Sequence, residues 1–85
     1  MSLYKVHFKR SAAKSLKKIR AEDREKIAAA IVGLRTTPRP PGSIKITNQN
    51  AYRIRQGDYR IIYTIDNNIL TIEIIKIGHR RDIYK

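Results

Sequence analysis

Arginine, histidine and tyrosine side chains gather in two short segments of the sequence, YRIRQGDYR (residues 52–60) and GHRRDIYK (residues 78–85). Such side chains suit cleavage of an RNA phosphodiester without a metal ion, because the ribose 2′-hydroxyl is itself the nucleophile. The protein must then orient that hydroxyl, stabilise charge on the phosphorane and move protons. Arginine suits the second task, since its fork pairs with phosphate oxygens and stays charged at any working pH. Losing one such donor costs on the order of 100-fold to 1000-fold in rate.

Other kinds of catalytic site find little support in the sequence. The carboxylates are few and scattered, His7 and His79 are far apart in the chain, and there is no cysteine. Glycines do not form a nucleotide-binding loop, and no serine lies in the setting of an activated nucleophile. The sequence therefore predicts neither a metal site nor a cofactor.

The same basic and aromatic residues also have structural interpretations. Arg53 and Arg55 are equally compatible with solvated strand positions, because basic residues often protect exposed strands. The lysine-rich face of the first helix fits a solubility or docking surface. Tyr59 and Tyr63 alternate with apolar residues and fit a core, and His7 fits the protein surface.

Composition indicates a single domain, residues 1–85, with a net charge of +12 from 19 Lys and Arg against 7 Asp and Glu. A charge this basic favours a polyanionic partner: nucleic acid, an anionic membrane surface or an acidic protein. No run approaches the roughly 18 apolar residues that span a bilayer, and the N-terminus does not resemble a signal peptide. With no cysteine, the chain suits a reducing compartment, so we expect a cytoplasmic protein.

The first half of the chain predicts a strand followed by a helical hairpin. Residues Tyr4–Phe8 alternate as in a half-buried strand. Ser11 is the expected N-cap of a helix over residues 12–20. Acidic residues then open a second helix over residues 22–34, and the loop of residues 35–43 contains all three prolines.

The second half predicts strands only. A short strand is expected over residues 44–46, and longer strands are expected over residues 52–56, 59–66 and 69–77. Two-residue turns at Gly57-Asp58 and Asn67-Asn68 would connect the last three as an antiparallel meander. The predicted architecture is an α+β domain: an N-terminal strand, an antiparallel helical hairpin and a three-stranded antiparallel meander, with the helices packed on one sheet face.

The expected register of the first turn groups the arginines. It pairs Gln56 with Tyr59 and places Arg55 directly opposite Arg60, with Arg53 on the same face. Like charges in opposite positions destabilise a sheet, so this arrangement needs another explanation. The helix-covered face is expected to carry the apolar residues Ile54, Ile61, Tyr63, Ile65, Leu70, Ile72 and Ile74. The open face is expected to carry Arg53, Arg55, Arg60, Thr64, Thr71 and Glu73.

The order of these elements, with GDYRIIY and GHRRDIY in tandem, resembles the RelE/ParE superfamily of toxins from toxin-antitoxin pairs, specifically its RelE branch. The resemblance covers residues 4–84. It implies an endoribonuclease that enters the ribosomal A site and cuts mRNA there by 2′-hydroxyl attack, leaving a cyclic phosphate. Translation inhibition and growth arrest would follow.

The resemblance also implies roles for individual residues. Arg60 and Arg80 match the family's phosphate and transition-state contacts, and Tyr84 matches a tyrosine that stacks on or orients a base. Arg53 and Arg55 fall where the best-known member has lysines. They are expected to bind RNA phosphates, as are the basic residues Lys45 and Arg81.

Replacing lysine by arginine affects proton transfer, because arginine is a poor general base. Proton removal from the 2′-hydroxyl would then pass to His79, Tyr84, Lys45, a ribosomal group or water. His79 is the preferred candidate, because it directly precedes Arg80 and some relatives use a histidine in this region.

Partners and alternatives also follow from the resemblance. An acidic, partly disordered RelB-like antitoxin is expected to neutralise the basic surface, alongside mRNA and the ribosome as targets. Operator DNA would be contacted only through the antitoxin complex, and no membrane is expected as a partner. One alternative is a ParE-like inhibitor of DNA gyrase, and another is a relative that binds ribosomes or RNA without cutting.

Overall fold

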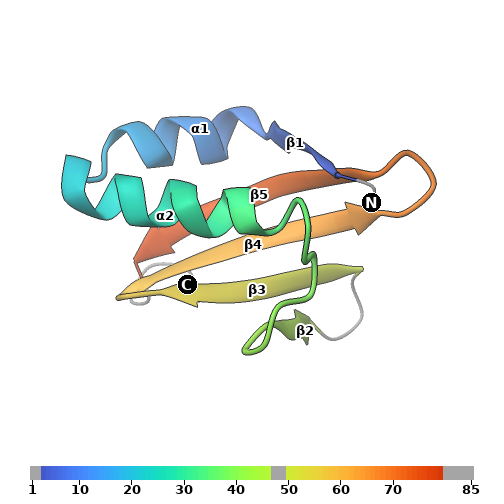
Figure 1. Ribbon diagram of the computed structural model, residues 1–85. Helices are drawn as coiled ribbons and strands as arrows, with labels where there is room; N and C mark the ends of the chain where they lie inside the picture. The colour runs from blue at the N-terminus through green and yellow to red at the C-terminus, as the bar shows by residue number, and fades with distance from the viewer. Residues whose placement is uncertain (1–2, 47–49, 80–85) are drawn as a thin grey trace.

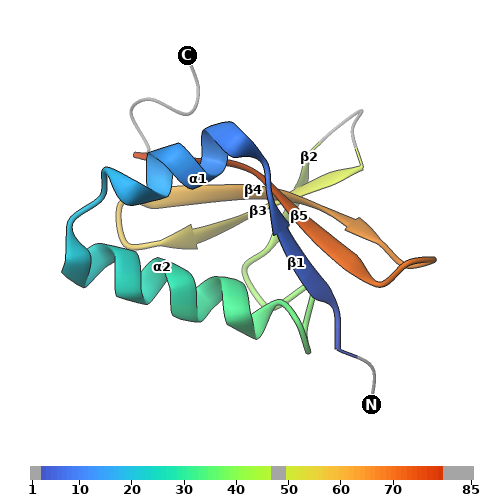
Figure 2. The same ribbon diagram turned by 90° about the horizontal axis from the view of Figure 1, so that it is seen from above.

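A five-stranded sheet carries both helices on one face (Figures 1 and 2). The computed structural model describes residues 3–46 and 50–79. The sheet order is β1-β5-β4-β3-β2, so the predicted meander is extended by one strand at each edge. The elements are β1 (Lys5–Phe8), α1 (Arg10–Lys17), α2 (Ala21–Gly33), β2 (Ile44–Ile46), β3 (Ala51–Gln56), β4 (Tyr59–Asp66) and β5 (Thr71–His79). The predicted α+β architecture is confirmed.

The helical hairpin begins earlier than the sequence predicted. Ser11 lies inside α1 rather than at its N-cap, which is Lys9 and makes no side-chain capping bond. The Lys9 amide donates to Ile74 O (2.9 Å) and its carbonyl accepts from Ala13 N (3.0 Å). A single residue thus joins the end of β1 to the first turn of α1. The acidic start of α2 is confirmed, with Glu22 and Asp23 in its first turn.

The N-terminal strand pairs in parallel with the last strand. Val6 lies opposite Ile72, and Phe8 lies opposite Ile74. A parallel pair cannot be closed by a hairpin, so the chain between β1 and β5 forms the rest of the domain. This pairing joins the two ends of the described chain and places α1 against β5.

The first hairpin has the register that the sequence predicts. Gln56 pairs with Tyr59, Arg55 with Arg60 and Ile54 with Ile61. Gly57 has a φ of 60°, which glycine adopts without the steric cost that other residues pay. The register of this hairpin therefore places the two like-charged side chains, Arg55 and Arg60, opposite each other.

The second hairpin differs from the prediction of a two-residue turn. Asp66 pairs with Thr71, which leaves residues 67–70 as the connection. The Asp66 side chain stabilises this longer connection, because its Oδ1 accepts hydrogen bonds from the amides of Asn68 (2.9 Å) and Ile69 (3.2 Å), and β5 begins two residues later than predicted. Leu70 has a φ of 48° and lies in this turn, not in the strand core. The register moves by two residues, so the predicted faces of Ile72 and Ile74 are preserved.

A β-bulge then reverses the alternation of β5. Tyr63 pairs with Ile74 but Ile62 pairs with Lys76, so Ile75 is the extra residue. Ile74 and Ile77 are consequently both buried, three positions apart. Beyond the bulge, even-numbered residues of β5 lie on the open face and odd-numbered ones on the helix-covered face.

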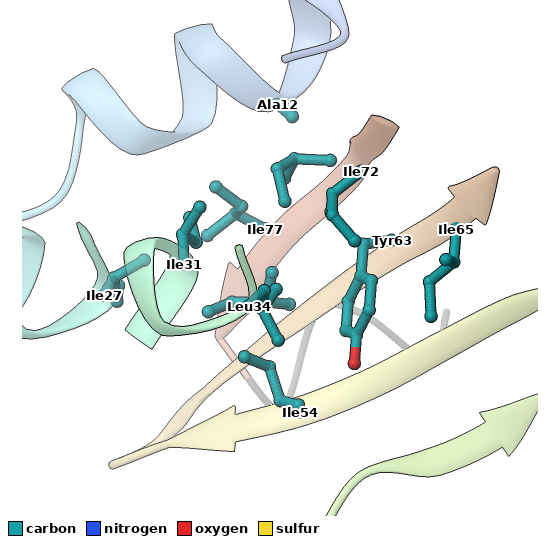
Figure 3. Packing of buried hydrophobic residues seen from close by; sticks show 11 residues of the cluster. Ala12, Ile27, Ile31, Leu34, Ile54, Tyr63, Ile65, Ile72 and Ile77 are labelled. Carbon is teal, nitrogen blue, oxygen red and sulfur yellow. The ribbon is translucent and has the colours of Figure 1, made fainter. Parts of the chain in front are cut away.

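The core lies between the helices and the sheet (Figure 3). Its fully buried members include Ile27 and Leu34 from α2 and its C-cap, and Ile61 and Tyr63 from β4. The Tyr63 hydroxyl donates to the carbonyl of Pro38 (2.7 Å), and burial raises the pKa of Tyr63 to about 12. The predicted core role of Tyr63 is confirmed, and Tyr59 is partly buried against the same cluster.

Candidate nucleic-acid interface

Three arginines share the open face of the sheet near the first hairpin. Arg55 and Arg60 are directly opposite each other on β3 and β4, and Arg53 is two residues from Arg55. Residues in opposite positions have Cβ atoms roughly 4.5–5.5 Å apart. At this separation both guanidinium groups can reach the same phosphate. Arg55 is exposed, Arg53 is half-buried and Arg60 is only 6% exposed.

A cavity of about 830 Å³ opens beside these arginines at the outer edge of β3. The short strand β2 pairs only with residues 51–53, so the rest of β3 has an uncovered edge among the described strands. The cavity extends around that edge, because it contacts Ile54 from the helix-covered face and Arg55 from the open face. Its lining is Ala30, Gly33, Thr36, Thr37, Pro40, Pro41, Gly42, Ile44, Arg53, Ile54, Arg55 and Arg60.

The cavity gives access to the least exposed arginine. Arg60 is buried, yet it forms part of the cavity wall. Its Nη1 donates to the carbonyl of Tyr59 at 3.5 Å, which is a long hydrogen bond. An anion that entered along the edge of β3 would meet the exposed Arg55 first and Arg60 deeper in the cavity.

The proline-containing loop that closes one side of the cavity is held to the sheet by hydrogen bonds at Pro38 and Arg39. Pro38 accepts the hydrogen bond of the buried Tyr63, and within the loop Ser43 N donates to Pro40 O (3.0 Å). Arg39 Nε donates to the Tyr52 hydroxyl (3.0 Å), a bond that lowers the pKa of Tyr52 and raises that of Arg39. Prolines further restrict the backbone. Sequence reasoning identified this stretch as a loop but missed its place in the site, although its three prolines were a signal of rigidity.

His79 and Lys45 lie away from the arginines. His79 pairs with Tyr59, and the two rings meet edge to face with centroids 5.7 Å apart. Both residues line a separate cavity of about 390 Å³ together with Ser15 of α1, on the helix-covered face. Lys45 pairs with Tyr52, also on that face. The bulge in β5 is the reason for the position of His79, since uninterrupted alternation would have put it with Arg60.

None of the other candidate residues is placed beside the three arginines by the described part of the structure. Arg80, Arg81 and Tyr84 lie outside the described residues. His7 is a surface residue, as the sequence predicts, and its Nδ1 is 3.2 Å from Glu73. Among the described residues, no group of three or more His, Cys, Asp and Glu side chains is arranged to hold a metal ion.

Comparison with known proteins establishes the family. Residues 6–84 match the family model described as the ParE toxin of type II toxin-antitoxin systems, parDE. The chain belongs to the RelE/ParE toxin superfamily. The toxin is 41% identical over 34 residues to Toxin RelG of Mycobacterium tuberculosis, a match that spans 40% of this chain and 39% of that relative.

Solved structures of RelE proteins share the fold. The RelBE2 toxin-antitoxin complex of Mycobacterium tuberculosis has a TM-score of 0.79 and 25% identity, covering 92% of this chain and 99% of that chain. The RelB-RelE complex of Methanococcus jannaschii has a TM-score of 0.74 and 28% identity, covering 92% and 94%. Together with the family match, these similarities place this protein among the toxins of type II toxin-antitoxin systems. Neither of its helices, over the described residues, has the length and apolar character that crossing a membrane requires.

Proposed function

We propose that this toxin is a ribosome-dependent endoribonuclease that cleaves mRNA in the ribosomal A site by 2′-hydroxyl attack, without a metal ion. The observation that carries this proposal is the opposed pair Arg55 and Arg60 at the wall of an open cavity, with Arg53 beside them. Opposed like charges cost folding free energy. A phosphate between them would offset that cost and would be held by charge-assisted hydrogen bonds.

The cleavage needs charge stabilisation and two proton transfers. The 2′-oxygen attacks phosphorus, the bond from phosphorus to the 5′-oxygen breaks, and a 2′,3′-cyclic phosphate and a 5′-hydroxyl result. Arg60 and Arg55 would contact the non-bridging oxygens, Arg53 the neighbouring phosphate, and Arg80 the charge that develops in the transition state. Tyr84 would stack on or orient a base.

The sequence favoured His79 as the group that removes the 2′-hydroxyl proton, but we assign this role to another group. His79 lies on the other face of the sheet from Arg60, next to Tyr59, so it does not face the same phosphate. Lys45 is likewise on the Tyr52 side and would contact an outlying stretch of RNA, while Arg81 stays a predicted phosphate contact. Removal of the 2′-hydroxyl proton then falls to Tyr84, a ribosomal group or water, because arginine stays protonated.

The expected partners follow from charge. With a net charge of +12, the toxin would be neutralised by an acidic RelB-like antitoxin, and RelB proteins accompany the RelE structures to which it is similar. Operator DNA would be bound through the antitoxin complex. We place both proteins in the cytoplasm, where the translated message is.

Primer extension on a reporter mRNA after brief induction, with and without active translation, tests this proposal. Cuts within codons, only on translated messages, are expected. Arg60→Ala and Arg80→Ala should each abolish the cuts and the growth arrest while circular dichroism shows a retained fold. Arg24→Ala, which removes an exposed arginine of α2, is the matched control and should remain toxic. Folded Arg60→Ala protein that still cuts would refute the proposed site.

Inhibition of DNA gyrase is the second candidate, because the matching family model is described as the ParE toxin. The same experiment separates the two functions. Damaged DNA with intact transcripts would indicate gyrase inhibition. Arrested growth with intact DNA and intact transcripts would indicate a toxin that binds the ribosome without cutting.

A further inference from the structure

The cavity beside the arginines is built for more than a phosphate group. Apart from Arg53, Arg55 and Arg60, every residue of its wall is uncharged. Its volume of about 830 Å³ falls within the range of roughly 300–1,000 Å³ that is typical of small-molecule sites. A bare phosphate would use the arginines and leave this uncharged space empty.

We propose that the cavity binds the nucleoside attached to the phosphate that Arg55 and Arg60 hold, and that the loop of residues 35–43 selects among nucleobases. This inference rests on the proposed function, since it takes RNA as the substrate. RNA places a flat, largely apolar ring a few bonds from each negative charge. The cavity has the complementary arrangement, with guanidinium groups on one wall and proline and isoleucine surfaces on another.

The wall of the cavity offers apolar contacts to the face of a base and hydrogen-bonding groups to its edge. Pro40 and Ile44 offer apolar surface to the face of a ring, and Ile44 is 51% exposed. Thr36 and Thr37 bring hydroxyl groups for the edge. The Thr36 hydroxyl donates to Gly33 O (3.3 Å), so its oxygen can still accept a hydrogen bond.

Selectivity requires that the wall keep its shape, and the loop is held in place. The buried Tyr63 binds the Pro38 carbonyl at 2.7 Å, and the Arg39 guanidinium lies over the Tyr52 ring at 5.1 Å as well as donating to its hydroxyl. A cavity whose wall is already ordered loses little conformational entropy on binding. A base of the wrong shape or hydrogen-bonding pattern is then rejected rather than accommodated.

Gly33, the last residue of α2, offers a sharp test. It lines the cavity, and a Cβ at this position would meet nothing within 4 Å. Gly33→Leu should therefore fill cavity space while leaving the fold intact. The adjacent Val32 is 61% exposed and does not line the cavity, so Val32→Leu is the matched control. Neither substitution changes the charge, so the non-specific electrostatic attraction to RNA stays the same.

The assay is fluorescence anisotropy with labelled trinucleotides of A, C, G and U that carry 2′-fluoro groups, so that no cut can occur. We expect wild-type protein to rank the four RNAs. Gly33→Leu should weaken the best of them by about tenfold or more, as loss of one stacked base would. Val32→Leu should bind like wild type. Thr37→Val, which removes a hydroxyl with little change in volume, should alter the ranking and serves as the second variant should Gly33→Leu not fold.

Two results would overturn the inference. One is a folded Gly33→Leu protein, or a Thr37→Val protein, whose affinities for all four RNAs equal those of wild type. The other is a Gly33→Leu protein that no longer binds a poly-glutamate peptide but binds RNA like wild type. That result would make the cavity a groove for an acidic protein. Binding here needs neither the ribosome nor cleavage, so absence of cut transcripts would count against the proposed function alone.

Discussion

Neutralising Arg55 should stabilise the free toxin while removing its activity. Arg55 is exposed and lies directly opposite Arg60. Two unit charges about 6 Å apart in a medium with the dielectric constant of water repel by roughly 0.7 kcal/mol. Arg55→Gln removes this repulsion, and a gain of that size raises the melting temperature of a domain this small by about 3–5 °C.

Thermal denaturation followed by circular dichroism, at low and high salt, checks this expectation. The gain should shrink as salt is added, because exposed charges are screened. Arg55→Lys keeps the charge and should melt like wild type, which makes it the matched control. In the same series, inorganic phosphate should raise the melting temperature of wild type more than that of Arg55→Gln, because only the former has the complete pair to bind it.

The opposite result has a clear meaning. If Arg55→Gln melted lower than wild type at low salt, Arg55 would be a stabilising strand residue and the opposed pair would carry no cost for a phosphate to offset. If phosphate stabilised both proteins equally, the anion would bind elsewhere on the basic surface. Either outcome would refute the phosphate clamp as the reason for this pair.

Two further expectations concern residues of the helix-covered face. Tyr63 has its pKa raised from 10.0 to about 12, so the stability that its neutral hydroxyl provides, up to roughly 3 kcal/mol, is complete below pH 10 and is lost as pH rises towards 12. Urea unfolding across that range should show a steeper loss for wild type than for Tyr63→Phe, and equal slopes would contradict the assignment. His79→Ala should lower mRNA cleavage by less than about tenfold, compared with the 100-fold or greater loss expected for Arg60→Ala; equal losses in primer extension would return His79 to the site.

Local sequence signals predicted the parts of the fold that local interactions determine. The Gly57 turn set the register of β3 and β4, and with it the opposition of Arg55 and Arg60. The second turn was misplaced by two residues because the Asp66 side chain caps a longer connection. A shift of two preserves the alternation at the start of β5, so Ile72 and Ile74 were still assigned correctly to the core, whereas Leu70 lies in the turn.

Long-range features were not readable from the sequence in the same way. The alternation of β1 indicates a strand but carries no information about its parallel partner β5. The cavity forms where residues 36–44 approach the edge of β3, two segments that meet only in the folded chain. Three of the candidate residues, Arg80, Arg81 and Tyr84, remain predictions from the resemblance.

The bulge at Ile75 shows how one extra residue can define a site. Without it, uninterrupted alternation would bring Ile75 and Ile77 to the open face, beside the arginines. With it, Ile77 is buried and Gly78 becomes the partner of Arg60 on β5. Arg60 is then flanked on the open face by Arg55 on one side and by a residue without a side chain on the other. The same extra residue thus places His79 on the helix-covered face and a glycine, instead of Ile77, beside Arg60 on the open face.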